Sequence, residues 1–435
     1  MYSSRTNQAI IYQSFNASFV TALLGPRRVG KSTLVSEFAR QSEEQAWAFF
    51  NMDKLTKRDA IKQRGLASII EEQTHRKLGS QPKIWIAIDE AQKCPLLFEQ
   101  IKVIYDQYKH QDAVKFILTG SGSLDLHQLS AETLAGRIEL FYLQEFNLRE
   151  TVTLQNQLTL PNVSSLDLII NGQDNQLTQV VEACSPFRRE LNHGLEEQLL
   201  WGGLPEVLKL QETAHRLRYL SYYLQTYLEK DIRAITTIND LNLYQKLIEI
   251  IAEQTGSLRQ DKRIIDALAC SRDTLKKYRG YLAATLIYQE IYPFINNPLQ
   301  RLVKSPKAYL LNNGLISYLT GIHDFKTLQS SGMIGHRLEN WFLKELNIAL
   351  TRSSQHSKIY YWRTAAGAEV DFIIHKKPVI LPFEVTVSKQ IQTNKLSNLR
   401  HFMQANPQAS KGFYIYMGEF KIDDNIYFIP AWLIC

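Results

Sequence analysis

The fold is decided by the stretch Phe19-Val-Thr-Ala-Leu-Leu24-Gly25-Pro26-Arg27-Arg28-Val29-Gly30-Lys31-Ser32-Thr33. Its apolar start has the length and composition of a buried strand, and the amphipathic residues that follow Ser32 are typical of a helix. The pattern GxxxxGK[ST] therefore lies between a strand and a helix, where backbone N–H groups and the positive helix N-terminus can surround phosphate oxygens. We expect the following residues to bind the phosphates of a nucleotide: Gly25, Pro26, Arg27, Arg28, Val29, Gly30, Lys31, Ser32 and Thr33.

Four side chains are expected to supply the chemistry of this site. Lys31 should reach the β and γ phosphates, and the Ser32 hydroxyl should ligate Mg²⁺. A second apolar run, Ile84 to Ile88, ends in Asp89 and Glu90. Asp89 is expected to hold the magnesium shell, and Glu90 to polarise the attacking water. An acidic pair at a strand end can also be a helix N-terminal charge pair, which is the alternative interpretation.

Short apolar runs alternate with helical periodicity up to about Glu150. This alternation predicts parallel strands joined by helices, which is an α/β domain. The expected strands are Phe19–Leu24, Ala46–Phe50, Ile84–Ile88, Phe116–Leu118 and Ile138–Tyr142. Thr119 and Ser121 follow the fourth run, so either hydroxyl could sense the γ phosphate, although a polar loop after a strand would look the same.

Length and composition are those of a multidomain globular protein. The chain has 435 residues, 45% of them hydrophobic, and 50 Lys and Arg against 43 Asp and Glu, which gives a net charge of +7. Its four cysteines are far apart in sequence, and no run reaches the ~18 apolar residues of a membrane span. We expect a soluble cytoplasmic protein with no membrane partner, built as four regions: 1–150, 151–235, 236–321 and 322–435.

The region that follows the α/β domain differs from it in amino-acid composition. Residues 151–187 contain no Lys or Arg, and their apolar residues are scattered. This pattern predicts a lid or an insertion, and a long surface excursion without chemistry is the plainer interpretation. The whole region 151–235 is expected to be a helical lid or linker.

The region 236–321 has the helix spacing of a winged helix. Helices are expected at Tyr244–Glu253, Gln260–Leu268 and Arg272–Ala283, with Ser271 as the cap of the third. Segments Leu286–Tyr292 and Ala308–Leu311 could form the wing, with Arg301, Lys304 and Lys307 between them. The third helix is expected to present a basic face to double-stranded DNA, with Arg272, Lys276, Lys277 and Arg279 as contacts. Basic faces are also commonly just solvated, and winged helices also bind proteins, so a protein client stays open.

An acidic set marks the last region. Glu339 is expected on a helix, and Asp371 and Glu384 on strands, so three carboxylates could converge on Mg²⁺. The arrangement resembles the restriction-endonuclease-like PD-(D/E)xK fold. That fold expects a lysine where this chain has Thr386, so cleavage would need Lys389 or Lys376 to replace it. A nuclease-shaped binding domain is therefore favoured over an active nuclease.

Several motifs together resemble the prokaryotic AAA-type ATPases that carry an uncharacterised C-terminal domain. They are Leu24–Ser32, Ile88–Gln92, Leu118–Ser121, Leu134–Arg137, Trp201–Glu206, Val303–Tyr309, Arg337–Asn340, Tyr361–Thr364 and Glu369–Phe372. The resemblance implies ATP as the nucleotide, an AAA-like sheet order, and Arg137 as a candidate catalytic arginine that reads the γ phosphate, across a subunit contact if the chain forms a homo-oligomer. A surface salt bridge is the other interpretation of Arg137.

The sequence as a whole favours a Mg²⁺-dependent ATPase. In this hypothesis ATP hydrolysis changes the conformation of a DNA-associated module made of the winged helix and the nuclease-like domain. A non-catalytic ATP-dependent switch or scaffold for a protein partner is the first alternative, and an ATP-gated nuclease is the second.

Overall fold

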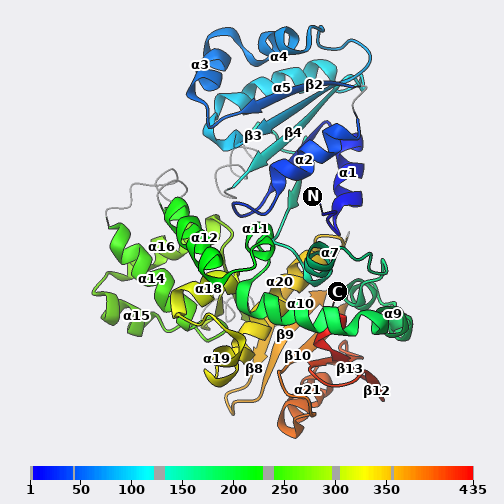
Figure 1. Ribbon diagram of the computed structural model, residues 1–435, viewed down its shortest axis with the longest axis vertical. Coiled ribbons are helices and arrows are strands. Elements are labelled where there is room, and N and C mark those ends of the chain that lie inside the picture. The colour runs from blue at the N-terminus through cyan, green and yellow to red at the C-terminus, as the bar shows by residue number, and fades with distance from the viewer. Residues whose placement is uncertain are drawn as a thin grey trace. The chain divides into compact units, whose positions relative to one another are not determined.

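The structure is a computed structural model, and it describes residues 3–42, 45–121, 133–228, 240–295, 304–353 and 357–434 (Figure 1). The chain divides into two compact units, one built on Met1–Glu145 with the short segment Ala284–Leu286, and the other on the remaining described residues. The predicted boundary at residue 235, together with Arg301 and Cys435, lies outside the described residues. The predicted subdivision of the second unit into three regions stays a prediction.

The first unit is a five-stranded parallel sheet covered by helices. Its order is β2-β3-β4-β1-β5, and every paired strand is parallel to its neighbour. All five strands predicted from the apolar runs are confirmed: β1 (Val20–Leu24), β2 (Ala46–Asn51), β3 (Ile84–Asp89), β4 (Val114–Gly120) and β5 (Ile138–Tyr142). Its helices are α1 (Gln8–Ala17), α2 (Lys31–Arg40), α3 (Leu55–Arg64), α4 (Leu66–Thr74) and α5 (Leu96–Tyr108).

The two faces of this sheet pack against different helices. Ile84, Ile86 and Ile88 of β3 belong to a hydrophobic core that includes residues of α3, α4 and α5. Trp85 points the other way, and its ring lies 5.0 Å from that of Phe38 on α2. Successive side chains are thus buried on opposite faces of the sheet. Because both faces are covered by helices, the strands are continuous apolar runs in the sequence.

The second unit joins many helices to an eight-stranded mixed sheet of order β12-β13-β11-β10-β9-β8-β6-β7. The strands are β6 (Tyr288–Pro293), β7 (Lys307–Leu310), β8 (Lys358–Arg363), β9 (Glu369–Lys376), β10 (Val379–Val385), β11 (Gly412–Tyr416), β12 (Lys421–Asp423) and β13 (Ile426–Pro430). Its helices are α7 (Leu148–Asn156), α8 (Ser165–Ile170), α9 (Leu177–Cys184), α10 (Arg188–Trp201), α11 (Pro205–Lys209), α12 (Thr213–Thr226), α14 (Leu241–Glu253), α15 (Asp261–Leu268), α16 (Arg272–Ala284), α18 (Asn313–Thr320), α19 (Phe325–Ser330), α20 (Ile334–Leu350) and α21 (Thr393–Ala405).

One strand pair connects two regions that the sequence separated. The helices α14, α15 and α16 are followed by the antiparallel hairpin of β6 and β7, as the winged-helix pattern predicted. Tyr292 of β6 also pairs in parallel with Tyr360 of β8. The hairpin therefore extends the sheet of the C-terminal region, and the two regions share one sheet.

The segment predicted to be a lid packs against the C-terminal part of its own unit. Asp167 on α8 pairs with Arg352 at 2.7 Å, and the buried Asp174 pairs with Lys411 at 2.5 Å. Ser165 donates a hydrogen bond to the Leu433 carbonyl. Cations from distant residues thus pair with carboxylates of this segment, and it is not a surface excursion.

A buried polar network lies between α7, α10 and α20, of which α10 and α20 pack against each other (Figure 1). Gln198 Oε1 accepts hydrogen bonds from Trp341 Nε1 and Lys344 Nζ, both at 2.7 Å. The neighbouring Glu345 lies 3.2 Å from the Lys344 ammonium and accepts a hydrogen bond from the Leu148 amide. Burial nevertheless raises the pKa of Glu345 to about 7.

We predict that Glu345→Gln stabilises the protein increasingly as the pH rises from 5 to 8. The folded pKa of Glu345 lies above its ordinary value of 4.5, so the stability it contributes is full below pH 4.5 and is lost as the pH rises through about 7. Glutamine cannot ionise, so the variant should gain about 2 to 3 kcal/mol relative to the wild type over this range. Paired denaturation curves at each pH measure the difference, and a difference that is flat with pH would contradict the assignment.

Candidate functional site

The phosphate-loop residues form a tight turn between β1 and α2. Gly25 and Gly30 have φ values of +155° and +97°, and a Cβ on Gly25 would lie 2.1 Å from the Leu143 carbonyl oxygen. Glycine is therefore required at residue 25 by space as well as by backbone conformation. The buried Lys31 donates hydrogen bonds to the carbonyls of Gly25 and Pro26, both at 2.8 Å. Its ammonium is thus held inside the turn.

Asp89 at the end of β3 connects three elements. Its Oδ1 accepts a hydrogen bond from Ser32 Oγ on α2 at 3.1 Å, and another from the Thr119 hydroxyl on β4. The sheet order explains this meeting, because β4 pairs with both β1 and β3, and parallel strands end at the same edge. Ser32 and Asp89, predicted from separate motifs as magnesium ligands, are therefore neighbours.

Glu90 is fixed in place beside this pair. It has a left-handed backbone with φ of 54°, and its Oε2 accepts hydrogen bonds from Ser121 Oγ at 3.0 Å and Gln92 Nε2 at 2.7 Å. The side chain of Ser121 thus contacts the expected base, while Thr119 contacts Asp89. Thr119 and Ser121, either of which could sense the γ phosphate, therefore contact different acids of the site.

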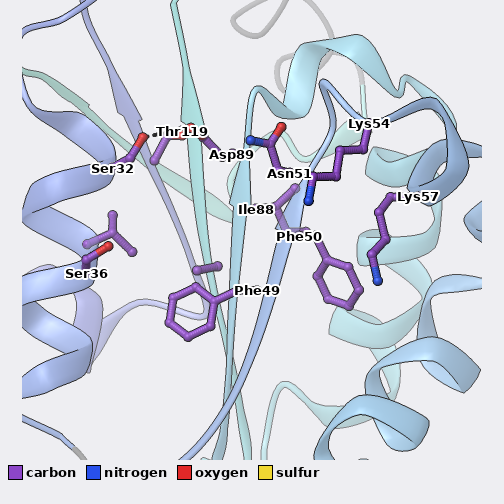
Figure 2. A pocket seen from close by; sticks show the side chains of 12 residues that line it. Ser32, Ser36, Phe49, Phe50, Asn51, Lys54, Lys57, Ile88, Asp89 and Thr119 are labelled. Atoms are coloured by element: carbon purple, nitrogen blue, oxygen red, sulfur yellow. Dashed lines mark hydrogen bonds between the residues drawn. The ribbon is translucent and has the colours of Figure 1, made fainter.

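A pocket of about 320 Å³ opens beside Asp89. Figure 2 shows Ser32 and Thr119 near Asp89 on one side, and Lys54 and Lys57 on the other. Phe49 and Phe50 of β2 also line it. The pocket gives the carboxylate of Asp89 access to solvent and leaves room for a hydrated cation.

These residues fit ATP and Mg²⁺. Oxygen donors are the ligands that Mg²⁺ prefers, and Asp89 and Ser32 supply two within hydrogen-bonding distance of each other. The turn of Gly25 to Gly30 presents backbone N–H groups at the start of α2, where a phosphate is favoured. Bound Mg²⁺ would neutralise charge on the phosphates, while Lys31 would bind them and Glu90 would orient water.

Arg5 is a structural part of this site that the sequence did not reveal. It is 8% exposed, and its guanidinium donates hydrogen bonds to the Val29 carbonyl at 2.7 Å and the Gln144 carbonyl at 2.6 Å. Arg5 therefore connects the phosphate loop to the segment that follows β5. A single arginine outside any motif carries no signal that could have predicted this contact.

Arg137 does not lie at the phosphate loop of its own chain, so its expected role there is corrected. It precedes β5, whose first residue Ile138 pairs with Val20, whereas the phosphate loop follows Leu24 at the opposite end of β1. At ~3.3 Å per residue, the strand separates the two by more than 10 Å. Arg137 instead lies 3.4 Å from Asp106, which is the salt bridge considered as the alternative. A role across a subunit contact stays a prediction.

The basic face of α16 is smaller than predicted. Arg272, Lys276 and Lys277 are exposed, and Ser271 caps the helix by accepting a hydrogen bond from the Thr274 amide. Arg279 is 7% exposed and pairs with Asp261 of α15, so the prediction that it lies on the exposed face is wrong. Arg279 lies on the same buried side of the helix as Leu275 and Leu282, where the carboxylate of Asp261 neutralises its charge.

The three predicted acids of the C-terminal region do converge, and two lysines lie among them. Lys307 Nζ lies 3.5 Å from Glu339, 3.4 Å from Asp371 and 2.5 Å from Glu369. Lys395 Nζ on α21 lies 2.5 Å from Glu384 and 3.4 Å from Asp371. We call these six residues the acid–lysine cluster: Lys307, Glu339, Glu369, Asp371, Glu384 and Lys395.

The lysine of this cluster was expected at other positions. Lys376 donates a hydrogen bond to the Ile170 carbonyl, and Lys389 is exposed, so neither replaces the lysine missing at Thr386. Lys395, on the helix α21, is instead the lysine that contacts both Asp371 and Glu384. Because α21 follows β10 through a loop, spacing along the strand could not have predicted it.

Burial and charge act differently on the carboxyl groups of the cluster. Burial raises the pKa of Glu339 to about 7, and it raises the pKa of Glu384 well above its ordinary range, helped by the neighbouring Asp371. Burial also acts to raise the pKa of Asp371, but Lys395 and Lys307 outweigh it and lower that pKa. Asp371 is therefore the ionised centre of the cluster.

Three family models match successive parts of the chain. Residues 17–152 match a model described as an AAA domain. Residues 192–326 and 334–434 match two models described as domains of unknown function, DUF8612 and DUF4143. The first match agrees with the parallel sheet and the phosphate loop, so the first unit has the features of an AAA-type P-loop ATPase domain.

Relatives extend over most of the chain. Uncharacterized proteins of Mycobacterium tuberculosis and Mycobacterium bovis are each 24% identical over 431 residues, which is 98% of this chain and 83% of theirs. Among solved structures, the Walker-type ATPase PABY2304 of Pyrococcus abyssi is similar with 17% identity and a TM-score of 0.47, over 74% of this chain and 96% of that one. The ORC2 protein of Aeropyrum pernix, in its ADPNP–ADP complexes, has 13% identity and a TM-score of 0.38, over 74% of this chain and 93% of that one.

Across the described ranges, no helix is both long and apolar enough to span a membrane.

We predict that Arg5→Ala weakens nucleotide binding about tenfold and destabilises the first unit by about 1.5 to 3 kcal/mol. The guanidinium makes charge-assisted hydrogen bonds to buried carbonyls, and their loss frees the phosphate loop. Titration with a fluorescent ATP analogue and thermal denaturation measure the two effects. Arg40→Ala, which removes a 67% exposed side chain from α2, is the matched control and should change neither. Equal behaviour of the two variants would contradict the prediction.

Proposed function

We propose that the protein is a Mg²⁺-dependent ATPase that uses hydrolysis to change the conformation of its DNA-associated second unit. The observation that carries the proposal is the arrangement around Asp89. Ser32 of the phosphate loop contacts Asp89, and Glu90 is held beside it by Ser121 and Gln92. Lys31, Ser32, Asp89 and Glu90 carry the chemistry in this proposal.

The chain itself provides a route for coupling. The Leu143 amide donates a hydrogen bond to the Leu24 carbonyl, directly before the phosphate loop. Arg5 holds the Gln144 carbonyl of the same segment. The chain then enters the second unit through Asn147, which caps α7 with a complete capping box. A shift of the loop on ATP binding or hydrolysis would therefore pull on the segment that leads into α7.

Double-stranded DNA is the proposed partner of the second unit. The support is the order of α14, α15, α16 and the β6–β7 hairpin, with a capped helix whose exposed face holds Arg272, Lys276 and Lys277. Exposed cations on one helix face can contact phosphates along a groove. Arg279 is excluded as a contact because it is buried.

Steady-state ATP hydrolysis with and without duplex DNA tests the function. We expect turnover that is lost in Lys31→Ala and Glu90→Gln and that DNA stimulates several-fold. Turnover unaffected by DNA would point to a protein client instead. Nucleotide that stays bound through purification with negligible turnover would replace the ATPase by an ATP-dependent switch or scaffold.

A salt titration tests the DNA contacts separately. Replacing Arg272, Lys276 and Lys277 together by Ala should weaken duplex DNA binding and lower the slope of log affinity against log salt by about 2 to 3, since each phosphate contact contributes about one. The control removes the same charge elsewhere, at the exposed Lys326, Lys358 and Lys377. Equal slopes for both triple variants would rule out α16 as the DNA-binding face.

A second candidate function, ATP-gated cleavage of phosphodiester bonds, draws on the convergence of Glu339, Asp371 and Glu384 around the two lysines. Mg²⁺-dependent nicking of DNA that disappears in Asp371→Ala and Glu384→Ala would support it. Absence of nicking under ATP turnover would leave a nuclease-shaped binding domain.

A further inference from the structure

The acid–lysine cluster does not fit the divalent metal that a nuclease-like site requires. Within the described residues, no group of three or more His, Cys, Asp and Glu side chains is arranged to hold a metal ion. The cause is visible at Asp371, whose two oxygens are both engaged: Oδ1 by Lys307 at 3.4 Å, and Oδ2 by Lys395 at 3.4 Å and by the Val385 amide at 2.9 Å. Hard cations bind carboxylate oxygens at about 2.0 to 2.6 Å, so a metal would have to displace an ammonium.

Of the two lysines, Lys307 comes from outside the nuclease-like part. It lies on β7, which pairs with β6 in the hairpin that follows α16, and it also forms a bridge with Leu258 between α14 and α15. Its side chain is only 5% exposed. Three carboxylates, from α20 and β9, surround its ammonium, as three ligands would surround a metal ion.

Two residues in or beside the cluster have buried polar atoms that receive no hydrogen bond in the described part of the chain. Among the described residues, the Tyr309 hydroxyl is buried with no hydrogen-bond partner, and the buried Glu384 Oε2 receives no hydrogen bond from an amide, hydroxyl or ammonium group. Tyr309 is 0% exposed and Glu384 is 2% exposed. The charges of Glu339, Asp371 and Lys307 act on Tyr309, which places its ring beside the cluster. Buried oxygen atoms without partners are unusual in a purely structural ion cluster, because each carries a desolvation cost.

The chain leading into β7 contacts β8 close to Lys307. The Tyr361 hydroxyl on β8 donates a hydrogen bond to the Ser305 carbonyl at 2.6 Å, and the Lys307 ammonium lies 5.8 Å from the centre of the Tyr361 ring. Both contacts hold the chain before β7, and the Lys307 side chain, beside Tyr361 of β8.

We propose that Lys307 closes this acidic site in place of a divalent cation, so that the β6–β7 hairpin and the cation compete for the same carboxylates. The site then takes Mg²⁺ or Mn²⁺ only when the Lys307 ammonium withdraws from these carboxylates. The inference deepens the second candidate function, because any metal-dependent cleavage would require this withdrawal first. It does not depend on ATP hydrolysis.

Mn²⁺ binding to the nucleotide-free full chain, followed by the electron paramagnetic resonance signal of free Mn²⁺, tests the inference. Lys307→Met should gain one Mn²⁺ site with affinity about tenfold or more above that of the wild type, and adding Asp371→Asn should remove it. Lys344→Met, which removes another buried lysine from the same unit, is the matched control and should gain none. A folded Lys307→Met protein that gains no site would overturn the inference.

Three further measurements keep the test decisive. If Lys307→Met fails to fold, Lys307→Met with Glu369→Gln removes equal and opposite charges and should show the same gain. In the wild-type background, Asp371→Asn should leave Mn²⁺ binding unchanged, and a wild-type Mn²⁺ site lost on that substitution would contradict the closed state. DNA nicking is measured in parallel. A Lys307→Met protein that binds Mn²⁺ without nicking DNA supports the closed site and excludes only the second candidate function, cleavage of phosphodiester bonds.

Discussion

The hydrogen bonds to the Asp89 carboxylate are the constraint on which the first unit depends. Ser32 reaches it from the first turn of α2, and Thr119 reaches it from β4. Both contacts require the ends of β1, β3 and β4 to lie at one edge, which the parallel order of the sheet provides. The same edge holds Glu90, and the segment after β5 passes beside the phosphate loop on its way to the second unit.

The sequence predicted the first unit well because its signals are local. A strand, a glycine turn and a helix are adjacent at Lys31, and the acids directly follow a buried run at Asp89. Contacts that join distant segments could not be read in the same way. Arg5 contacts a loop far along the chain, and Arg279 follows the basic residues of α16 in sequence but is buried against Asp261 of α15.

The second unit shows the same division between local and long-range information. The helices predicted at Tyr244–Glu253, Gln260–Leu268 and Arg272–Ala283 follow periodic patterns and are confirmed. The pairing of Tyr292 with Tyr360 was not predicted, because no motif specifies which edge a hairpin joins. That pairing brings Lys307 to Asp371. A lysine from the region 236–321 thus lies among three carboxylates of the C-terminal region.

The most direct measurement of the central claim is the Mg²⁺ dependence of ATP affinity in the wild type, Asp89→Asn and Lys31→Ala proteins, by calorimetric titration. The account predicts that Mg²⁺ strengthens ATP binding at least about tenfold in the wild type. Asp89→Asn should lose this enhancement but still bind ATP, while Lys31→Ala should bind weakly with or without Mg²⁺. ATP binding that is unchanged in all three proteins would contradict the assignment of the site.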